Sequence, residues 1–157
     1  MNPNILTALA VCFAGVLLEG LCAGSGVKKY LGELRWPSFS PPLWAWYTIG
    51  VVYYVVVFVC LYRVLRCPPL PFRNAALALL LVIVVLNALW NVLFFRAKNL
   101  RATFIFSLCY SVIVIGCWYC LSQFNHLVAF VFGFYVIYLV YANVLGYRLW
   151  RLNSSAG

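Results

Sequence analysis

The sequence predicts an all-α protein, an integral membrane bundle of five transmembrane helices. Hydrophobic residues make up 67% of the chain and charged residues only 8%, whereas charged residues supply roughly a quarter of an ordinary soluble domain. The apolar residues fall into five stretches, each long enough to cross about 30 Å of hydrocarbon. These stretches lack the alternation of period two that marks a membrane barrel. The three observations exclude a soluble globular protein and favour one compact helical bundle.

The predicted spans are joined by short connections, so residues 1–157 are expected to form a single transmembrane domain with no soluble part. The spans are predicted at about residues 5–23, 43–65, 75–95, 102–121 and 127–149. The first stretch lacks the basic segment and cleavage site of a signal peptide, so we expect it to be retained as a helix.

The first span carries one acidic side chain, Glu19. If this helix runs to Gly26, the carboxyl group lies about 10 Å inside it at 1.5 Å per residue. A carboxyl group at such a depth is either a functional group or a partner in a buried hydrogen bond. Gly20 and Gly24 follow it with the spacing that permits a close helix contact, within the bundle or across a dimer.

The connection from Gly26 to Pro41 is predicted to be a stiff loop rich in proline and tryptophan. It leads into the run WPSFSPPLWAW at residues 36–46, whose three prolines exclude a continuous helix. The last two prolines stand directly before the second span, where a missing backbone N–H costs little. A loop of this length is often a lid or a binding loop. Its tryptophans are equally explained as an aromatic belt at the membrane surface.

The third span contains the most informative pattern, LNALWNVLFF at residues 86–95. Two asparagines and two large aromatic residues are spaced i, i+3, i+4, i+7 and so share one face of a helix. They are Asn87, Trp90, Asn91 and Phe94. An unpaired amide is costly in lipid, so this stripe should face other helices or an enclosed cavity. Two interpretations stay open. The stripe either forms hydrogen bonds that hold the helices together, or it forms the wall of a ligand pocket.

The formal charge of +9 comes from basic residues that flank the spans rather than from a patch with interleaved aromatics, so nucleic acid is not an expected partner. Eight of the 11 lysines and arginines fall on one side of the predicted membrane. They are Lys28, Lys29, Arg35, Arg96, Lys98, Arg101, Arg148 and Arg151. The other side has only Arg63, Arg66 and Arg73. The positive-inside rule predicts an external N-terminus and a cytoplasmic C-terminus, with anionic membrane lipid as a partner of the basic side.

The sequence gives little support for metal or catalytic chemistry. Most of the seven cysteines fall in or beside the spans, and the pair Cys117 and Cys120 has no second Cys-x-x-Cys pair to complete a metal site. The single histidine, His126, has no carboxylate or cysteine at ligand spacing. We therefore expect the cysteines to be small buried hydrophobic residues. No catalytic residue, metal ligand or required cofactor is assigned.

The loop and third-span passages together resemble the translocator protein or tryptophan-rich sensory protein family, also called the peripheral benzodiazepine receptor family. The family's first loop reads approximately K-P-x-W-x-P-P-x-W, and residues 36–44 match this spacing with substitutions. Its third helix reads approximately L-N-x-x-W-x-x-x-F-F, which residues 86–95 satisfy. The order of the five spans agrees, and residues 150–153 are similar to the family's usual ending, so the resemblance covers nearly the whole chain.

The chain is identified as a divergent member of that family, because several motif positions differ. Trp36 and Phe39 stand where the loop motif has lysine and tryptophan. Gly50 replaces the tryptophan of the second-helix motif V-W-x-x-L-Y. In the fifth helix, P-Y-L-x-W becomes FYVIY at residues 134–138 and A-x-x-L-N becomes ANVLG at residues 142–146. Some family members promote light-dependent porphyrin breakdown, attributed to the second-helix tryptophan, so that activity is not expected here.

The resemblance implies a dimeric five-helix bundle whose cavity, below the first loop, binds porphyrins, sterols and other hydrophobic ligands. Carried over by matching position, the ligand-binding residues are Pro42, Trp44, Gly50, Tyr54, Asn87, Trp90, Phe94, Tyr138, Ala142 and Leu145. The spacing of Tyr138, Ala142 and Leu145 independently places them on one helix face, which suits an apolar pocket wall.

The expected function is that of a membrane ligand-binding protein, a receptor, carrier or sensor for porphyrin, haem or a sterol-like lipid. One alternative is an enzyme, or an accessory of one, that modifies a bound tetrapyrrole or lipid, with Glu19 or a cavity tyrosine taking part. Another is a structural partner of a second membrane protein. The expected partners are a hydrophobic small molecule, membrane lipid and a second copy of the chain. A bacterial cytoplasmic membrane is the expected location, with the mitochondrial outer membrane as the alternative.

Overall fold

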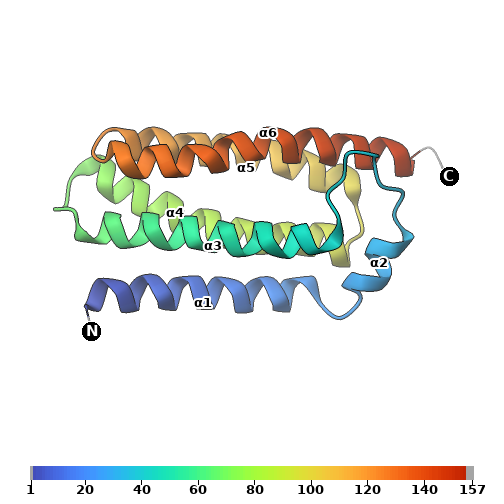
Figure 1. The fold of residues 1–157 in the computed structure, drawn as a ribbon, viewed down its shortest axis with the longest axis horizontal. Coiled ribbons are helices and arrows are strands. Elements are labelled where there is room, and N and C mark those ends of the chain that lie inside the picture. The colour runs from blue at the N-terminus through green and yellow to red at the C-terminus, as the bar shows by residue number, and fades with distance from the viewer. Residues whose placement is uncertain (1, 155–157) are drawn as a thin grey trace.

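The computed structural model describes residues 2–154, which contain helices and no strand (Figure 1). The elements are α1 (Pro3–Ala23), α2 (Val27–Glu33), α3 (Leu43–Arg66), α4 (Pro71–Asn91), the π-helical turn η1 (Val92–Arg96), α5 (Leu100–Ser122) and α6 (His126–Ser154). The predicted all-α fold class is confirmed.

Five helices of the described chain are long and apolar enough to cross a membrane, as predicted. They are α1, α3, α4 continued by η1, α5 and α6. The third span begins earlier than expected, at Pro71, because proline fits the first turn of a helix. The two ends of the chain lie at opposite ends of the bundle, since it contains five antiparallel passes (Figure 1). The protein is therefore an integral membrane protein.

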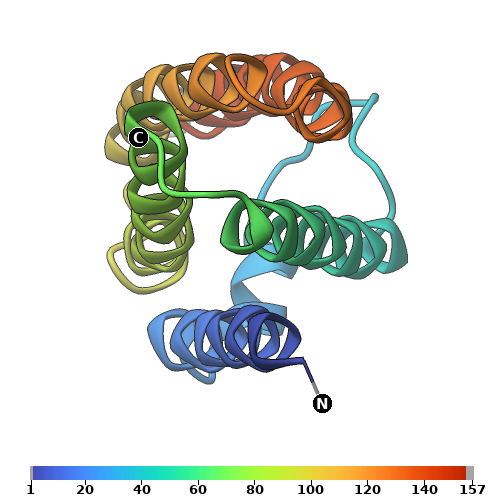
Figure 2. The ribbon, with the colours of Figure 1, turned by 90° about the vertical axis from the view of Figure 1, so that its left-hand side faces the viewer.

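The first helix lies at the edge of the bundle. Seen end-on, α1 is on the opposite side of α3 and α4 from α5 and α6 (Figure 2). Helices α3 and α4 both contact α1, while α5 packs between α4 and α6, and α6 also contacts α3. The largest fully buried side chains belong to α3 through α6, among them Leu61, Leu80 and Phe132. Helix α1 buries only Ala8 and Gly15, so it depends on close contact with α3 and α4.

The first loop contains a short helix, α2, that the proline pattern did not predict. All three prolines of the loop follow this helix, so they leave it free to form. Tyr30 of α2 packs edge-on against Phe94 with ring centroids 5.6 Å apart, and both are buried together with Leu149 of α6. Further along, Asn153 accepts a hydrogen bond from the backbone N–H of Arg35 and donates one to its carbonyl oxygen, both at 3.0 Å. These contacts hold the loop against the ends of the third and fifth spans.

The third span ends in a π turn. The N–H of Ala97 donates to the carbonyl oxygen of Val92 at 2.9 Å, five residues back instead of four. Such a turn places one extra residue in the helical register. Phe94 and Phe95 of this turn both contact the ring of Tyr30, at centroid distances of 5.6 and 6.5 Å. The expected stripe assumed a regular α-helix as far as Phe94, and the π turn interrupts that regularity just before it.

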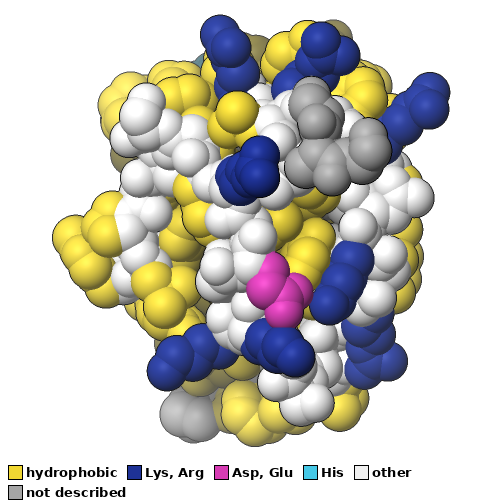
Figure 3. All heavy atoms as spheres, turned by 90° about the vertical axis from the view of Figure 1, so that its right-hand side faces the viewer, with side chains coloured by type: hydrophobic (Ala, Val, Ile, Leu, Met, Phe, Trp, Pro, Cys, Tyr) yellow, Lys and Arg dark blue, Asp and Glu magenta, His cyan; other side chains and the backbone are white. Residues whose placement is uncertain are grey.

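Basic side chains concentrate at the end of the bundle that carries α2 and the C-terminus. Figure 3 shows lysine and arginine side chains around this end, with one acidic side chain among them. Glu33 of α2 lies 3.9 Å from the ammonium group of Lys98, in a half-exposed ion pair. The smaller basic group of the chain, Arg63, Arg66 and Arg73, lies at the C-terminal end of α3 and the start of α4, at the opposite end of the bundle.

Candidate functional site

The centre of the candidate site is the carboxyl group of Glu19. The hydroxyl of Tyr54 on α3 donates to its Oε1 atom at 2.6 Å, and the side-chain amide of Asn87 on α4 donates to the same oxygen at 2.5 Å. Helix α1 ends at Ala23 rather than Gly26, so Glu19 is about 6 Å from the helix end. Tyr54 is about 16 Å along α3 from its first residue, Leu43. The three side chains thus join three different spans inside the apolar region.

Gly15 makes this convergence possible. A Cβ atom added there would come within 2.7 Å of Cγ1 of Val84 and 2.8 Å of the Tyr54 hydroxyl, so only glycine fits without a shift. The glycine pair singled out in the sequence behaves differently. An added Cβ at Gly20 would meet nothing within 4 Å, and Gly24 ends α1 with a φ of 74°. Within the bundle, the close helix contact is therefore made at Gly15, and a contact of Gly20 across a dimer stays a prediction.

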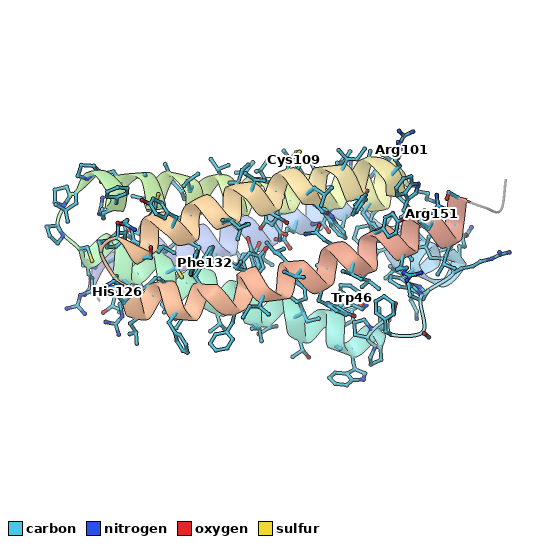
Figure 4. All side chains as sticks on the ribbon, turned by 90° about the horizontal axis from the view of Figure 1, so that it is seen from above. Trp46, Arg101, Cys109, His126, Phe132 and Arg151 are labelled. Carbon is cyan, nitrogen blue, oxygen red and sulfur yellow. The ribbon has the colours of Figure 1, made fainter. Side chains whose placement is uncertain are left out.

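A groove of about 600 Å³ runs between α1 and α3 and opens on the outside of the bundle. Its lining residues are Leu9, Cys12, Val16, Glu19, Trp46, Tyr47, Gly50, Val51, Tyr54, Val55 and Phe58. Its volume falls within the range of small-molecule sites, roughly 300–1,000 Å³. Trp46 lies at the same end of the bundle as Arg101 and Arg151 (Figure 4). The groove is thus lined mainly by apolar side chains. Its aromatic end lies near the basic end of the bundle, and the Glu19 carboxyl group lies along its length.

Two of the predicted ligand residues, Gly50 and Tyr54, line this groove, and Asn87 reaches its carboxyl group. An added Cβ at Gly50 would meet nothing within 4 Å. Pro42 and Trp44 lie at the start of α3, and Trp44 is 69% exposed. They lie outside the set that lines the groove.

The aromatic part of the third-span stripe lies elsewhere, below α2. Trp90 stacks on Phe94 with ring centroids 4.7 Å apart, and its indole N–H donates to the Ser107 hydroxyl on α5 at 3.0 Å. Both rings pack with Tyr30. Burial raises the pKa of Tyr30 above its ordinary value, and the negative charge of Glu33 raises it further. The contacts of Trp90 are those of interhelical packing.

The predicted residues of α6 form a third group. Tyr138 stacks on Tyr135 with centroids 6.2 Å apart, Leu145 is buried, and Ala142 is half-buried. The ten predicted residues therefore occupy several places along the bundle: the groove, the start of α3, the cluster below α2 and the inner face of α6. Their role in binding a ligand stays a prediction.

Sequence reasoning missed a second polar network between α5 and α6. The side-chain amide of Asn143 donates to the Ser111 hydroxyl at 2.8 Å, and the hydroxyls of Tyr110 and Tyr135 lie 2.6 Å apart. A signal was present in the sequence, because Ser107, Tyr110 and Ser111 are spaced i, i+3, i+4 on one face of the fourth span. Among the described residues, no group of three or more His, Cys, Asp or Glu side chains is placed to hold a metal ion.

Comparison with known proteins identifies a family. The sequence model of the TspO/MBR family matches residues 8–151, which is nearly the whole chain. This match confirms the resemblance drawn from the first loop and the third span. A comparison with curated proteins finds no match.

Proposed function

Because this chain belongs to the TspO/MBR family, we propose that it is a receptor, carrier or sensor that binds a tetrapyrrole or a sterol-like lipid in the groove between α1 and α3. Membership of the family is consistent with a membrane ligand-binding or sensor role. The groove itself is the observation that carries the proposal, since it combines a suitable volume with an apolar, aromatic lining.

The lining suits a flat hydrophobic ligand. Trp46, Tyr47 and Phe58 offer aromatic surfaces for stacking, and the missing side chain at Gly50 leaves a gap in the wall of α3. The aromatic end of the groove lies at the basic end of the bundle (Figure 4). A porphyrin bound there would direct its acidic substituents toward lysine and arginine side chains and its ring toward the apolar part of the groove.

Filling the groove tests the proposal. Gly50→Leu places a side chain in the groove, and we expect it to weaken protoporphyrin binding by about tenfold, as expected for the loss of one good contact surface. The titration is followed by quenching of tryptophan fluorescence and by the porphyrin absorbance band, in non-ionic detergent. Gly116→Leu is the matched control, because an added Cβ at Gly116 also meets nothing within 4 Å and Gly116 does not line the groove.

The two variants separate the possible results. Weaker binding in Gly50→Leu alone supports a ligand site in the groove. Equal affinity in the wild-type protein and both variants would place the porphyrin elsewhere in the bundle. Absence of binding by the wild-type protein to protoporphyrin and to a sterol would contradict the proposed ligand classes.

A further inference from the structure

Among residues 2–154, the carboxyl group that lines the groove forms no ion pair with a lysine or arginine side chain. The ion pair found among the described residues joins Lys98 to Glu33, at the end of the bundle that carries α2. Glu19 is held instead by two neutral donors, the Tyr54 hydroxyl and the Asn87 amide, and both act on its Oε1 atom. Its second oxygen, Oε2, makes no hydrogen bond to either donor. This leaves one acceptor of the carboxyl group available in an apolar groove.

An isolated carboxylate is costly in a low-dielectric setting, and a positive charge opposite it removes much of that cost. The two neutral donors offset part of that cost by hydrogen bonding, but they do not balance a negative charge. We propose that the groove binds a lipophilic amine, whose protonated nitrogen pairs with the Glu19 carboxylate while its hydrocarbon part fills the apolar lining.

The rest of the groove fits that chemistry. Apart from Glu19, its lining consists of aliphatic and aromatic side chains, one cysteine and Gly50. Trp46 and Tyr47 add aromatic faces, which attract ammonium groups. The lining contains one acidic side chain, so a monovalent organic cation matches its charge. A divalent metal ion does not match, because no set of metal ligands surrounds Glu19 among residues 2–154.

The inference rests on the groove being a ligand site, as in the proposed function, and adds a different class of ligand that Glu19 selects. A neutral porphyrin ring or sterol uses the apolar walls, whereas an amine also uses the carboxylate. The two ideas can therefore fail separately, since both ligands use the apolar walls of the groove but only amine affinity depends on the charge of Glu19.

The test uses dodecylamine as the probe and native mass spectrometry of the full-length protein in non-ionic detergent. Glu19→Gln keeps the size of the side chain and removes its charge, and we expect it to weaken amine binding by about tenfold or more, the size expected for losing a charge-assisted hydrogen bond. Glu33→Gln is the matched control, because Glu33 is the other acidic residue of the chain and lies outside the groove. It should bind dodecylamine within about twofold of the wild-type protein.

Matched ligands identify which property of the amine is recognised. N-dodecylacetamide keeps the chain and one N–H but carries no charge, and it should bind about tenfold more weakly than dodecylamine to the wild-type protein. Its binding should be the same in Glu19→Gln. Equal affinities of the amine and the amide for the wild-type protein would show a neutral apolar site and would overturn the inference.

A second variant covers the case in which Glu19→Gln fails to fold. Gly50→Leu leaves the carboxyl group in place and blocks the groove, so it should also weaken dodecylamine binding. If Glu19→Gln folds and binds dodecylamine like the wild-type protein, the inference is wrong even where porphyrin binding remains sensitive to Gly50→Leu. If dodecylamine binding is unchanged by Gly50→Leu, the inference is equally wrong, because the amine then lies outside the groove.

Discussion

Because Gly15 has no side chain, α1 can approach α3 and α4 closely enough for Glu19 to accept hydrogen bonds from both helices. Gly15 lets α1 approach Val84 of α4 and Tyr54 of α3 closely, and one turn later Glu19 reaches the Tyr54 hydroxyl. Because helix association in lipid depends on close packing and on polar contacts between helices, these two residues are expected to fix the position of α1, which otherwise buries little surface.

Gly15→Ala should therefore lower the stability of the protein by about 1–3 kcal/mol, the usual cost of overpacking a close contact. Gly20→Ala should leave stability unchanged or slightly higher, because its added methyl meets nothing within 4 Å and alanine favours a helix. Thermal unfolding in detergent, followed by circular dichroism, measures both. Equal losses in the two variants would show that the contact at Gly15 is not the cause.

Trp90 provides a second test at this scale, because its two proposed roles have different consequences. It stacks on Phe94, donates to Ser107 and does not line the groove. We expect Trp90→Ala to lower stability by about 2 kcal/mol or more and to change protoporphyrin affinity by less than about twofold. Fluorescence quenching and thermal unfolding of the same preparation measure the two effects. Large loss of affinity with unchanged stability would instead make Trp90 a ligand wall.

Among the elements, the five spans were predictable and the irregular segments were not. Long apolar runs bounded by prolines and basic residues indicate spans directly, because the membrane fixes their length. Helix α2 was missed because its seven residues form a helix stabilised by packing of Tyr30 on Phe94 and Leu149, which are distant in sequence. The π turn at residues 92–96 was missed because hydrophobic spacing alone does not distinguish it from a regular helix.

In the candidate site, the unusual residues were predictable from the sequence, but the contacts between them were not. Glu19, Asn87 and Tyr54 were each identified, from an acid in a span, a polar stripe and a family motif, yet their mutual contact depends on which helices are neighbours. The groove was not predictable, because its lining combines one face of α1 with one face of α3, and the spacing within each helix does not show that the two helices are neighbours. The sequence indicated which side chains are unusual, and the packing determined which of them meet.

Several side chains of the last helix contact the first loop, and the hydrogen bonds of one of them, Asn153, can be removed separately. Asn153→Ala deletes both hydrogen bonds to the backbone of Arg35, a loss of about 1–2 kcal/mol in the docking of the loop. Backbone amides of residues 31–42 should then exchange hydrogen about tenfold faster, as measured by mass spectrometry. Ser154→Ala is the control, because the Ser154 hydroxyl donates only to Arg151 within its own helix. No change in exchange would show that other contacts hold the loop, among them the hydrogen bond from the Tyr141 hydroxyl to the carbonyl oxygen of Phe39.

At the scale of the whole molecule, the two ends of the bundle differ in their number of basic side chains. The eight basic residues of the larger group lie in α2 and its loop, the end of the third span, the connection that follows it, the start of α5 and the end of α6. All of these segments meet at one end of the bundle, where Figure 3 shows a surface rich in lysine and arginine. The three residues of the smaller group lie at the other end. This distribution gives the topology a physical basis, because positively charged loops are retained in the cytoplasm.

We therefore predict that the end carrying α2 and the C-terminus faces the cytoplasm, and that the N-terminus of α1 is external. A reporter active only in the cytoplasm should work when fused after Gly157 and fail when fused before Met1, and a reporter active only outside should show the reverse. Replacing Arg63, Arg66 and Arg73 with glutamine should preserve this pattern, because it removes charge only from the external side. Activity of one reporter at both termini would contradict the five-span bundle. A complete reversal of the pattern would keep the bundle and show that the charge difference does not set its orientation.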